Sequence, residues 1–378
     1  ASLIGGYWIT NTIHVFGHIP FIFSLLITGA GYGLEVGLQL FVYFAIPLLC
    51  IKKLGNWELP LRLAYVIAID PWYPRLIHWN YGGLTFSQFP FLEQVADIIG
   101  SSGLLFYSLG LSYLLIAWWR LKSDVKNLND NEVGYKFLKR AIAAYSLLWA
   151  VGLCYGAWRI QDINENDNLQ NSDSFINVIA IQPNFSLQDL ASNPELAHSK
   201  RQSNLESLLE DSKKYLSKLS KQTDEPTLIV WPESVFPHPF FKVKEASQKV
   251  MRFAEENNTS VLFTTVDWKN TMTGRKFHGV SVLVGSNGEV LGRYNKIFLI
   301  PFGEMIPFSN IFPETASWLR NNIANMSEFD PGQDYKVFSL SEKVRLSAPI
   351  CFDVFSQEVV RGMSLNGANL VVNLSNLA

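Results

Sequence analysis

Apolar residues run almost unbroken through three stretches of the first 158 residues of the chain. A helix that crosses the hydrocarbon core of a membrane needs about 20 such residues in succession. Each stretch therefore predicts a membrane-spanning helix: residues 19–51, residues 98–119 and residues 141–158. Residues 59–69 form a shorter candidate span, and residues 7–18 are typical of the end of a further helix.

The basic residues between these runs predict how the helices are oriented. Lys52 and Lys53 lie on one connection, and six Lys and Arg residues lie on another, between residues 120 and 140. Short loops rich in Lys and Arg stay in the cytoplasm. If residues 59–69 cross the membrane, both basic connections face the cytoplasm and the residues after 158 lie outside it. If they do not, the two basic connections fall on opposite sides.

A change of pattern after residue 158 divides the chain into domains. Residues 159–174 are polar and turn-rich, which is typical of a linker. From residue 175 onward strand and helix patterns alternate, which is typical of an α/β domain. The expected strands are residues 176–181, 227–231, 260–266, 280–285, 345–350 and 369–374, and the expected helices are residues 195–221, 242–257 and 355–366. The sequence thus predicts a polytopic helical membrane domain over residues 1–158 and an α/β domain over residues 175–378.

Composition supports this division and excludes some functions. The chain is 48% hydrophobic and only 17% charged, against about 25% charged in an ordinary soluble domain. A net charge of −2, without a basic patch interleaved with aromatics, argues against nucleic-acid binding.

The three cysteines are Cys50, Cys154 and Cys351, and no Cys or His pair has metal-ligand spacing, so we expect no metal and no cofactor. The chain begins without Met or a signal-peptide pattern and stops inside an apolar run, so we expect truncation at both ends.

Three short segments, far apart in sequence, each place one reactive side chain at the end of an apolar run. Glu233 follows Leu-Ile-Val-Trp-Pro, Lys296 follows Arg-Tyr-Asn, and Cys351 follows Ala-Pro-Ile. A carboxylate, an ammonium and a thiol together make a thiol-acylation site, in which the base takes the thiol proton and the cation stabilises an oxyanion. The helical pattern that begins near Val354 would direct backbone N–H groups at Cys351 and favour the thiolate.

Each of these residues also has a plainer interpretation, and position alone does not choose between the two. Glu233 fits an ordinary surface acid after a strand, and Cys351 fits a buried structural cysteine. Lys296 fits a solvated lysine on an edge strand. Glu304 lies in Pro-Phe-Gly-Glu-Met-Ile-Pro, where the two prolines either aim its carboxylate or leave it exposed.

Taken together, the three segments resemble a known family. Glu233, Lys296 and Cys351 lie 63 and 55 positions apart, and they resemble the Glu-Lys-Cys triad of the nitrilase superfamily. The flanking Leu-Ile-Val-Trp-Pro-Glu-Ser, Tyr-Asn-Lys-Ile-Phe-Leu-Ile-Pro-Phe-Gly-Glu and Ile-Cys-Phe look closer to its membrane branch, the apolipoprotein N-acyltransferases. Tyr-Trp-Ile-Thr-Asn-Thr-Ile-His-Val-Phe-Gly, from residue 7 on, is similar to the aromatic segment of that family.

The resemblance implies a fold, a location and a reaction. It implies an α-β-β-α sandwich on the periplasmic side of a bacterial inner membrane. The implied reaction moves an acyl chain from a glycerophospholipid to the α-amino group of the diacylglyceryl-cysteine of an apolipoprotein, through a thioester on Cys351. Glu233 would act as the base and Lys296 would stabilise the oxyanion, with Glu304 supporting one of them. Phospholipid and apolipoprotein are the implied partners.

The sequence departs from the family at two places. The family usually follows the nucleophile with Tyr-Glu, and here Phe352 and Asp353 follow it. His278 stands where the family more often has Asn. We expect Phe352 and Asp353 to support the site. Candidate substrate contacts lie in one outward loop and in the apolar loops around the site: Trp79, Tyr81, Phe302 and Phe308.

Two other functions remain open at this point. A membrane-tethered carbon–nitrogen hydrolase would use the same three residues on an amide or a nitrile, with water as the acyl acceptor. The apolar loops that contain Phe240 and Phe298 argue against a soluble substrate. A catalytically degenerate homologue that binds lipid is the second alternative, which Phe352 and Asp353 keep open and the intact Glu, Lys and Cys argue against.

Overall fold

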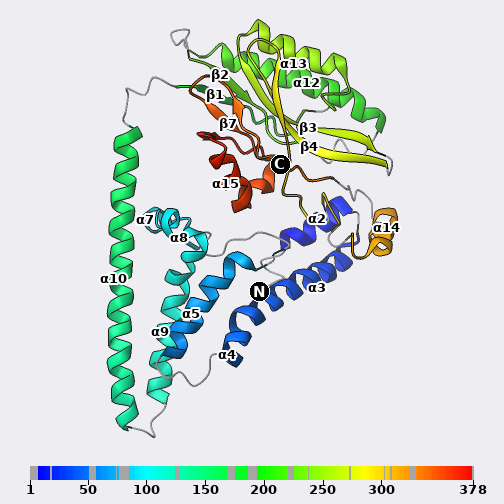
Figure 1. Ribbon diagram of the computed structural model, residues 1–378. Helices are drawn as coiled ribbons and strands as arrows, with labels where there is room; N and C mark the ends of the chain where they lie inside the picture. The colour runs from blue at the N-terminus through cyan, green and yellow to red at the C-terminus, as the bar shows by residue number, and fades with distance from the viewer. Residues whose placement is uncertain are drawn as a thin grey trace. The chain divides into compact units, whose positions relative to one another are not determined.

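The chain folds into two compact units, Ala1–Asn171 and Ser172–Ala378, each with its own apolar core. The computed structural model (Figure 1) describes residues 7–17, 19–50, 57–73, 75, 85–123, 128–167, 175–185, 194–219, 225–236, 238–271, 274–301, 303–306, 309–322 and 329–376.

Unit 1, residues 1–171, is helical wherever the structure describes regular elements in it. Two of its helices are long and apolar enough to cross a membrane by length and composition, Phe21–Cys50 and Val133–Glu165. Both coincide with predicted runs. The elements of unit 1 are α2 (Tyr7–Gly17), α3 (Phe21–Leu40), η1 (Phe41–Ala45), α4 (Ile46–Cys50), α5 (Glu58–Ile69), η3 (Asp70–Trp72), α7 (Pro90–Glu93), α8 (Ala96–Gly103), α9 (Leu105–Ser123) and α10 (Leu128–Asp167).

Three predictions for this unit need correction. The run at 98–119 is broken, because α8 and α9 meet at a bend of 58° and Gly100 inside α8 adopts φ 68°, a conformation that suits glycine. Residues 59–69 form the 12-residue helix α5, which is shorter than a span requires. Helix α10 continues to Asp167, so residues 159–167 are helical and do not belong to a linker.

A buried polar network connects several helices of unit 1. The Asp70 carboxylate, only 3% exposed, accepts hydrogen bonds from Tyr43, Arg75 and Ser102. Gln39 donates to the Tyr43 hydroxyl at 3.1 Å. Tyr43 belongs to η1, a π-helical turn inside an otherwise continuous helix. Such turns are rare and appear mostly as single turns inside α-helices. The network therefore joins η1, η3 and α8.

Unit 2 contains two sheets. The larger has the order β1 (Asn177–Ala180), β2 (Thr227–Val230), β3 (Ser260–Thr271), β4 (Gly274–Val284) and β5 (Val290–Asn295). Its first three strands run parallel, and β3, β4 and β5 pair antiparallel. The smaller has the order β6 (Phe338–Ser339), β7 (Arg345–Ser347) and β8 (Leu370–Val371). The prediction of an α/β domain is confirmed, although the sequence did not predict β5 and β6.

Successive side chains along the strands of unit 2 point to opposite faces of the larger sheet, and an apolar core lies on each face. Ile229 and Trp231 face a core shared with α12 (Pro194–Leu216) and α13 (Lys244–Glu256). Leu228 and Val230 face the opposite core, which contains Leu346 of the smaller sheet and residues of α15 (Gln357–Leu365). Helices, sheet, sheet and helix thus follow one another, as Figure 1 shows for α12, α13 and the sheet. The remaining elements are η4 (Cys351–Phe355) and α14 (Pro313–Asn322).

We predict that Asp70→Ala lowers the stability of the full-length protein by about 3–5 kcal/mol, because it leaves the buried Arg75 guanidinium without its carboxylate. The measurement is thermal unfolding in detergent, followed by tryptophan fluorescence. The control is Asp97→Ala, since Asp97 is 41% exposed where it contacts Arg159. Equal losses of stability in the two variants would contradict a special role for the buried network.

Candidate active site

Glu233 lies directly after β2, on a turn that its neighbours hold in place. Trp231 is fully buried, and its indole N–H donates to the Ser212 hydroxyl at 3.0 Å. Ser234 adopts φ 60°, and its backbone N–H donates to the Thr264 hydroxyl at 2.9 Å. These contacts fix the backbone on both sides of Glu233, whose side chain remains 18% exposed. Glu233 is therefore partly shielded at a strand end and differs from an ordinary surface acid.

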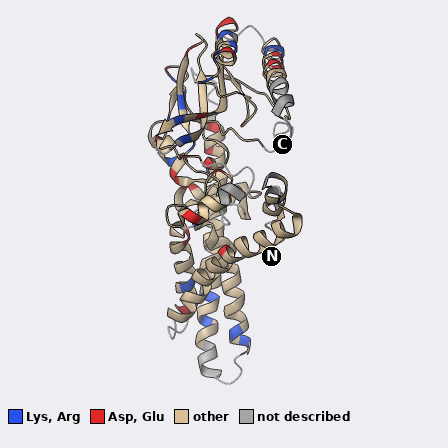
Figure 2. Cartoon of the chain, turned by 90° about the vertical axis from the view of Figure 1, so that its right-hand side faces the viewer, with Lys and Arg blue, Asp and Glu red and all other residues tan. Residues whose placement is uncertain are grey.

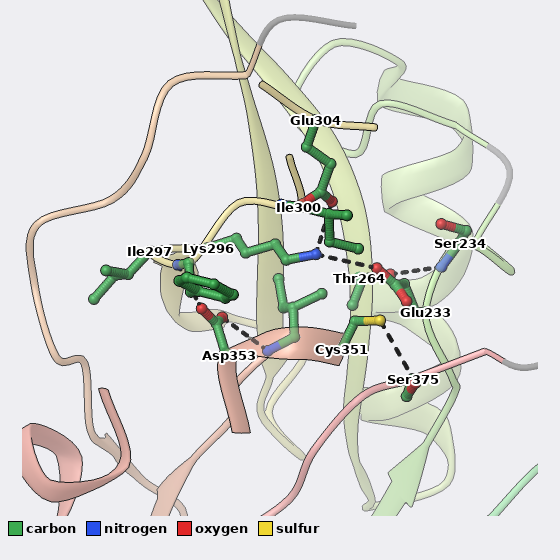
Figure 3. Close-up of polar contacts among 12 residues, drawn as sticks. Glu233, Ser234, Thr264, Lys296, Ile297, Ile300, Glu304, Cys351, Asp353 and Ser375 are labelled. Carbon is green, nitrogen blue, oxygen red and sulfur yellow. Dashed lines mark hydrogen bonds and ion pairs between the residues drawn. The ribbon is translucent and has the colours of Figure 1, made fainter. Parts of the chain in front are cut away.

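Lys296 follows β5, and its side chain is buried. Its backbone N–H donates to the Gly279 carbonyl at 2.8 Å, and its own carbonyl accepts from the Gly332 N–H at 2.7 Å. The side chain is 1% exposed, and Nζ lies 2.7 Å from Glu304 Oε1 and 3.7 Å from Glu233 Oε1 (Figure 3). These contacts exclude a solvated lysine on an edge strand.

Glu304 is aimed at the site by its own loop. Its Oε1 accepts from the Lys296 ammonium, and its Oε2 accepts from the Ile300 backbone N–H at 2.9 Å. The Glu304 carbonyl also accepts from the Phe329 N–H at 2.7 Å. The carboxylate is thus held at both oxygens, and the interpretation of Glu304 as a freely exposed acid is wrong.

Cys351 begins the 3-10 turn η4 and adopts φ 51°, which L side chains rarely adopt. Its backbone N–H donates to the Leu374 carbonyl at 2.8 Å, so the C-terminal strand segment supports the turn. The Cys351 thiol lies beside the Glu233 carboxylate, whose charge acts on its pKa (Figure 3). The Ser375 hydroxyl lies 3.7 Å from Sγ and donates to it. Glu233, Lys296 and Cys351 therefore meet in one site.

The charges of the site set its resting protonation. Burial and the Glu233 carboxylate raise the pKa of the Cys351 thiol to about 11, although Lys296 opposes them. Burial also raises the pKa of Glu233, against the pull of Lys296. Burial disfavours the Lys296 ammonium, but Glu304 and Glu233 outweigh it and the pKa of Lys296 is raised. At neutral pH Cys351 therefore rests as a thiol and Lys296 as an ammonium.

The expectation that a helix N-terminus would favour the Cys351 thiolate is wrong. Helix α15 begins only at Gln357, after η4, and the hydroxyl of its N-cap residue Ser356 accepts from the Val359 N–H. The thiol lies six residues before that helix and beside a carboxylate. Its proton must therefore be removed during the reaction.

Asp353 joins the Cys351 turn to the Lys296 segment. It is fully buried, and its carboxylate accepts from the Tyr294 hydroxyl at 2.8 Å, the Phe298 N–H at 2.7 Å and the Ile350 N–H at 3.0 Å. Burial raises the pKa of Asp353, and these donors act against that rise. Phe352, beside it, packs on Phe355 with ring centroids 5.3 Å apart. Asp353 therefore fixes the geometry of the site by connecting the backbone before Cys351 to the backbone after Lys296.

The remaining predicted residues divide into two groups. The His278 Nδ1–H donates to the Asp330 carbonyl at 2.8 Å. The candidate substrate contacts lie outside the described residues: Trp79, Tyr81, Phe302 and Phe308. Within the described part of the chain, no group of three or more His, Cys, Asp or Glu side chains is placed to hold a metal ion. Sequence reasoning missed Ser375 and Thr264, whose Ser and Thr types carry no signal of their own.

Comparison with known proteins identifies the class. The carbon-nitrogen hydrolase family model matches residues 190–378, and the chain belongs to this family. Among solved structures, an amidase from Nesterenkonia sp. is 22% identical, with 47% of this chain and 60% of that chain covered at a TM-score of 0.33.

The curated relatives confirm the resemblance noted in the sequence. The apolipoprotein N-acyltransferases of Geobacter metallireducens and Borreliella burgdorferi are each 24% identical, over 98% and 100% of this chain. That of Haemophilus influenzae is 26% identical over 98% of this chain. The chain spans 66% of the length of each of these three relatives.

We predict that alkylation of Cys351 by iodoacetamide rises about tenfold per pH unit between pH 7 and pH 10, because only the thiolate reacts and the pKa lies near 11. The measurement uses a Cys50→Ser/Cys154→Ser background, in which Cys351 alone is labelled. Glu233→Gln removes the carboxylate that raises this pKa, so its alkylation at pH 8 is expected to be faster. A rate that stays flat over this range would mean that the thiol is already ionised.

We predict that Asp353→Ala destabilises the protein by about 1–3 kcal/mol or more, because three buried donors lose their acceptor. The same variant should slow reaction at Cys351, since the Cys351 and Lys296 segments are no longer joined. Thermal unfolding and turnover are measured side by side. The matched variant Asp334→Ala removes an exposed acid and is expected to change neither quantity; comparable effects would argue against the joining role.

Proposed function

We propose that the chain carries the catalytic site of an apolipoprotein N-acyltransferase, which transfers an acyl chain from a glycerophospholipid to the α-amino group of a diacylglyceryl-cysteine. One observation carries the proposal. The Glu233 carboxylate lies beside the Cys351 thiol, and its Oε1 lies 3.7 Å from the Nζ of Lys296, whose side chain is 1% exposed (Figure 3). Similarity to apolipoprotein N-acyltransferases over nearly the whole chain supports the choice of substrates.

The first half-reaction forms a thioester. Glu233 takes the proton of Cys351 as Sγ attacks the ester carbonyl carbon of the phospholipid. The developing oxyanion is stabilised by the Lys296 ammonium, which is already oriented and shielded from water. When the tetrahedral intermediate collapses, the C–O bond breaks and the departing lysophospholipid oxygen takes the proton from Glu233. The acyl group is left on Sγ.

The second half-reaction reverses these roles. The free α-amino group attacks the thioester carbonyl, and Glu233 accepts a proton from the nitrogen. The C–S bond breaks, the amide forms, and the Cys351 sulfur regains its proton from Glu233. The raised pKa of Glu233 suits its role as the base in both half-reactions, because a carboxylate that binds a proton more firmly removes one from a thiol more readily.

Glu304 has a separate part in this scheme. It holds the Lys296 ammonium at 2.7 Å, against 3.7 Å for Glu233. A Lys296–Glu233 ion pair as short as the one to Glu304 would favour the ionised base further and lower its affinity for the proton. Glu304 therefore leaves Glu233 available for proton transfer while keeping Lys296 charged.

The lipid substrates fit the first part of the chain. Helices long and apolar enough to cross a membrane precede the catalytic unit in sequence, so both acyl-bearing substrates can keep their chains in a bilayer. We place the protein in the bacterial inner membrane with its catalytic unit on the periplasmic side. The similarity to apolipoprotein N-acyltransferases supports this orientation. The two basic connections do not decide it, because α5 has 12 residues and is too short to cross the membrane.

Membership of the carbon-nitrogen hydrolase family favours one competing function, acyl transfer to water from an amide or a nitrile. The two functions share the thioester on Cys351 and differ only in the donor and the acceptor. An experiment that follows the acyl group through both half-reactions therefore separates them.

We predict that full-length protein in detergent, incubated with a phospholipid carrying an alkyne-tagged acyl chain, gains a hydroxylamine-labile tag on Cys351. A diacylated lipopeptide should discharge the tag and become labelled. Cys351→Ser and Glu233→Gln should each lower tagging at least about a hundredfold, since general base catalysis contributes about 10²–10⁴ in rate. The matched control Cys154→Ser should be tagged normally, because Cys154 lies on α10 in unit 1.

Two outcomes would contradict this proposal. Discharge to water alone, with no labelled lipopeptide, would establish the hydrolase. The absence of any adduct in a folded protein would support a catalytically degenerate lipid-binding homologue instead.

A further inference from the structure

A serine hydroxyl lies beside the Cys351 sulfur, on a segment to which none of the three reactive residues belongs. Ser375 Oγ is 3.7 Å from Cys351 Sγ and donates a hydrogen bond to it (Figure 3). Ser375 comes after β8, 24 residues further along the chain, and it is half-buried. The sulfur therefore contacts a hydroxyl in addition to lying beside the Glu233 carboxylate. The two half-reactions described above do not use this hydroxyl.

Backbone pairing fixes the position of the hydroxyl. Leu374 forms a parallel bridge with Ile350. The Leu374 N–H donates to the Pro349 carbonyl at 3.0 Å, and the Leu374 carbonyl accepts from the Cys351 N–H at 2.8 Å. The Leu374 side chain is 1% exposed and belongs to the core that the two sheets share. Because successive side chains of a paired segment point to opposite faces, Ser375 points away from that core and towards the sulfur.

The segment that carries Ser375 brings no charged side chain to the site. No Lys, Arg, Asp or Glu follows Arg361 in the sequence, and the described chain that leads to Ser375 is tan in Figure 2. Burial and the Glu233 carboxylate raise the pKa of the Cys351 thiol. Lys296 and the Ser375 hydrogen bond act to lower that pKa. Ser375 is thus a neutral donor that favours the thiolate.

We propose that Ser375 is a further catalytic residue, whose hydroxyl stabilises the Cys351 thiolate by a hydrogen bond while Glu233 holds the proton. A hydrogen bond to an ionised group is shorter and about twice as strong as one between neutral groups. The bond from Ser375 therefore gains strength when the S–H bond breaks. An interaction that is stronger in the charged state than in the resting state lowers the barrier. The proton of the Ser375 hydroxyl stays on its own oxygen throughout.

The hydroxyl acts twice in the acyl-transfer cycle, a role that rests on the proposed function. In the first half-reaction it stabilises the sulfur while Glu233 removes the proton and the S–C bond forms, after which the negative charge lies on the carbonyl oxygen beside Lys296. In the second half-reaction the C–S bond breaks, and the departing thiolate regains the hydrogen bond until Glu233 returns the proton. Ser375→Ala should therefore slow both the formation and the discharge of the thioester.

The test measures alkylation of Cys351 by iodoacetamide from pH 7 to pH 10, in full-length protein that carries Cys50→Ser and Cys154→Ser. Ser375→Ala should slow alkylation at pH 8 about threefold. Loss of a hydrogen bond to a charged group lowers the thiolate fraction about tenfold, and a more basic thiolate is more nucleophilic, which restores part of the rate. Ser375→Thr keeps the hydroxyl and should react at nearly the wild-type rate. The matched control Ser364→Ala removes an exposed hydroxyl of α15 and should change nothing.

A second background separates contact with the sulfur from an effect that passes through Glu233. Glu233→Gln alone is expected to speed alkylation, the opposite of the effect of Ser375→Ala. A hydroxyl that acts on the sulfur itself should still slow alkylation about threefold when Ser375→Ala is added to Glu233→Gln. Thermal unfolding of every variant shows that each of them is folded.

Three results would overturn the proposal. Equal alkylation of Ser375→Ala and the wild type would mean that the hydroxyl does not stabilise the thiolate. An effect that disappears in the Glu233→Gln background would make Ser375 a positioning residue for that carboxylate. A folded Ser375→Thr variant as slow as Ser375→Ala would show that packing sets the rate.

Failure of the proposed function would look different from failure of this inference, because alkylation needs no lipid. A wild-type protein that gains no acyl tag, but shows the expected alkylation rates, would contradict acyl transfer and support the role of Ser375.

Discussion

The buried Lys296 ammonium is the constraint on which the candidate active site depends. An ammonium that is 1% exposed requires compensating charge, and Glu304 and Glu233 supply it from two different segments. Glu304 is held in turn by the Ile300 N–H, and Glu233 lies beside the Cys351 thiol on the turn that Thr264 holds through the Ser234 N–H. Burial of one cation thereby determines where two carboxylates and the nucleophile lie. Removing Glu304 would leave the buried ammonium with the Glu233 carboxylate at 3.7 Å as its remaining ion-pair partner, which is destabilising.

Much of the α/β unit could be predicted from the sequence because its strands are continuous apolar runs. Residues 227–231 and 260–266 alternate between two cores, and both were expected as strands. Strand β5 was not expected, since Val290–Asn295 contains Gly292 and Arg293, and pairing with β4 imposes its conformation. The broken run in unit 1 was missed for a similar reason, because a single glycine at position 100 has no strong signal among so many apolar residues.

The reactive residues could be found from the sequence, but their protonation could not. The positions of Glu233, Lys296 and Cys351 at the ends of apolar runs indicate the chemistry. Their pKa values depend on burial and on distances between side chains that lie 63 and 55 positions apart. The sequence could not predict that Asp353 connects the Cys351 and Lys296 segments either. Its three hydrogen-bond donors come from separate positions and meet at one carboxylate only after folding.

The high pKa of Cys351 has a consequence for the lifetime of the enzyme. Sulfur is oxidised and exchanges with disulfides chiefly as the thiolate. With a pKa of about 11, roughly one site in 10⁴ carries a thiolate at pH 7. Peroxides and disulfides therefore meet an almost inert sulfur between turnovers. Burial, together with the neighbouring Glu233 carboxylate, thus keeps the Cys351 sulfur in the thiol form that oxidants attack slowly.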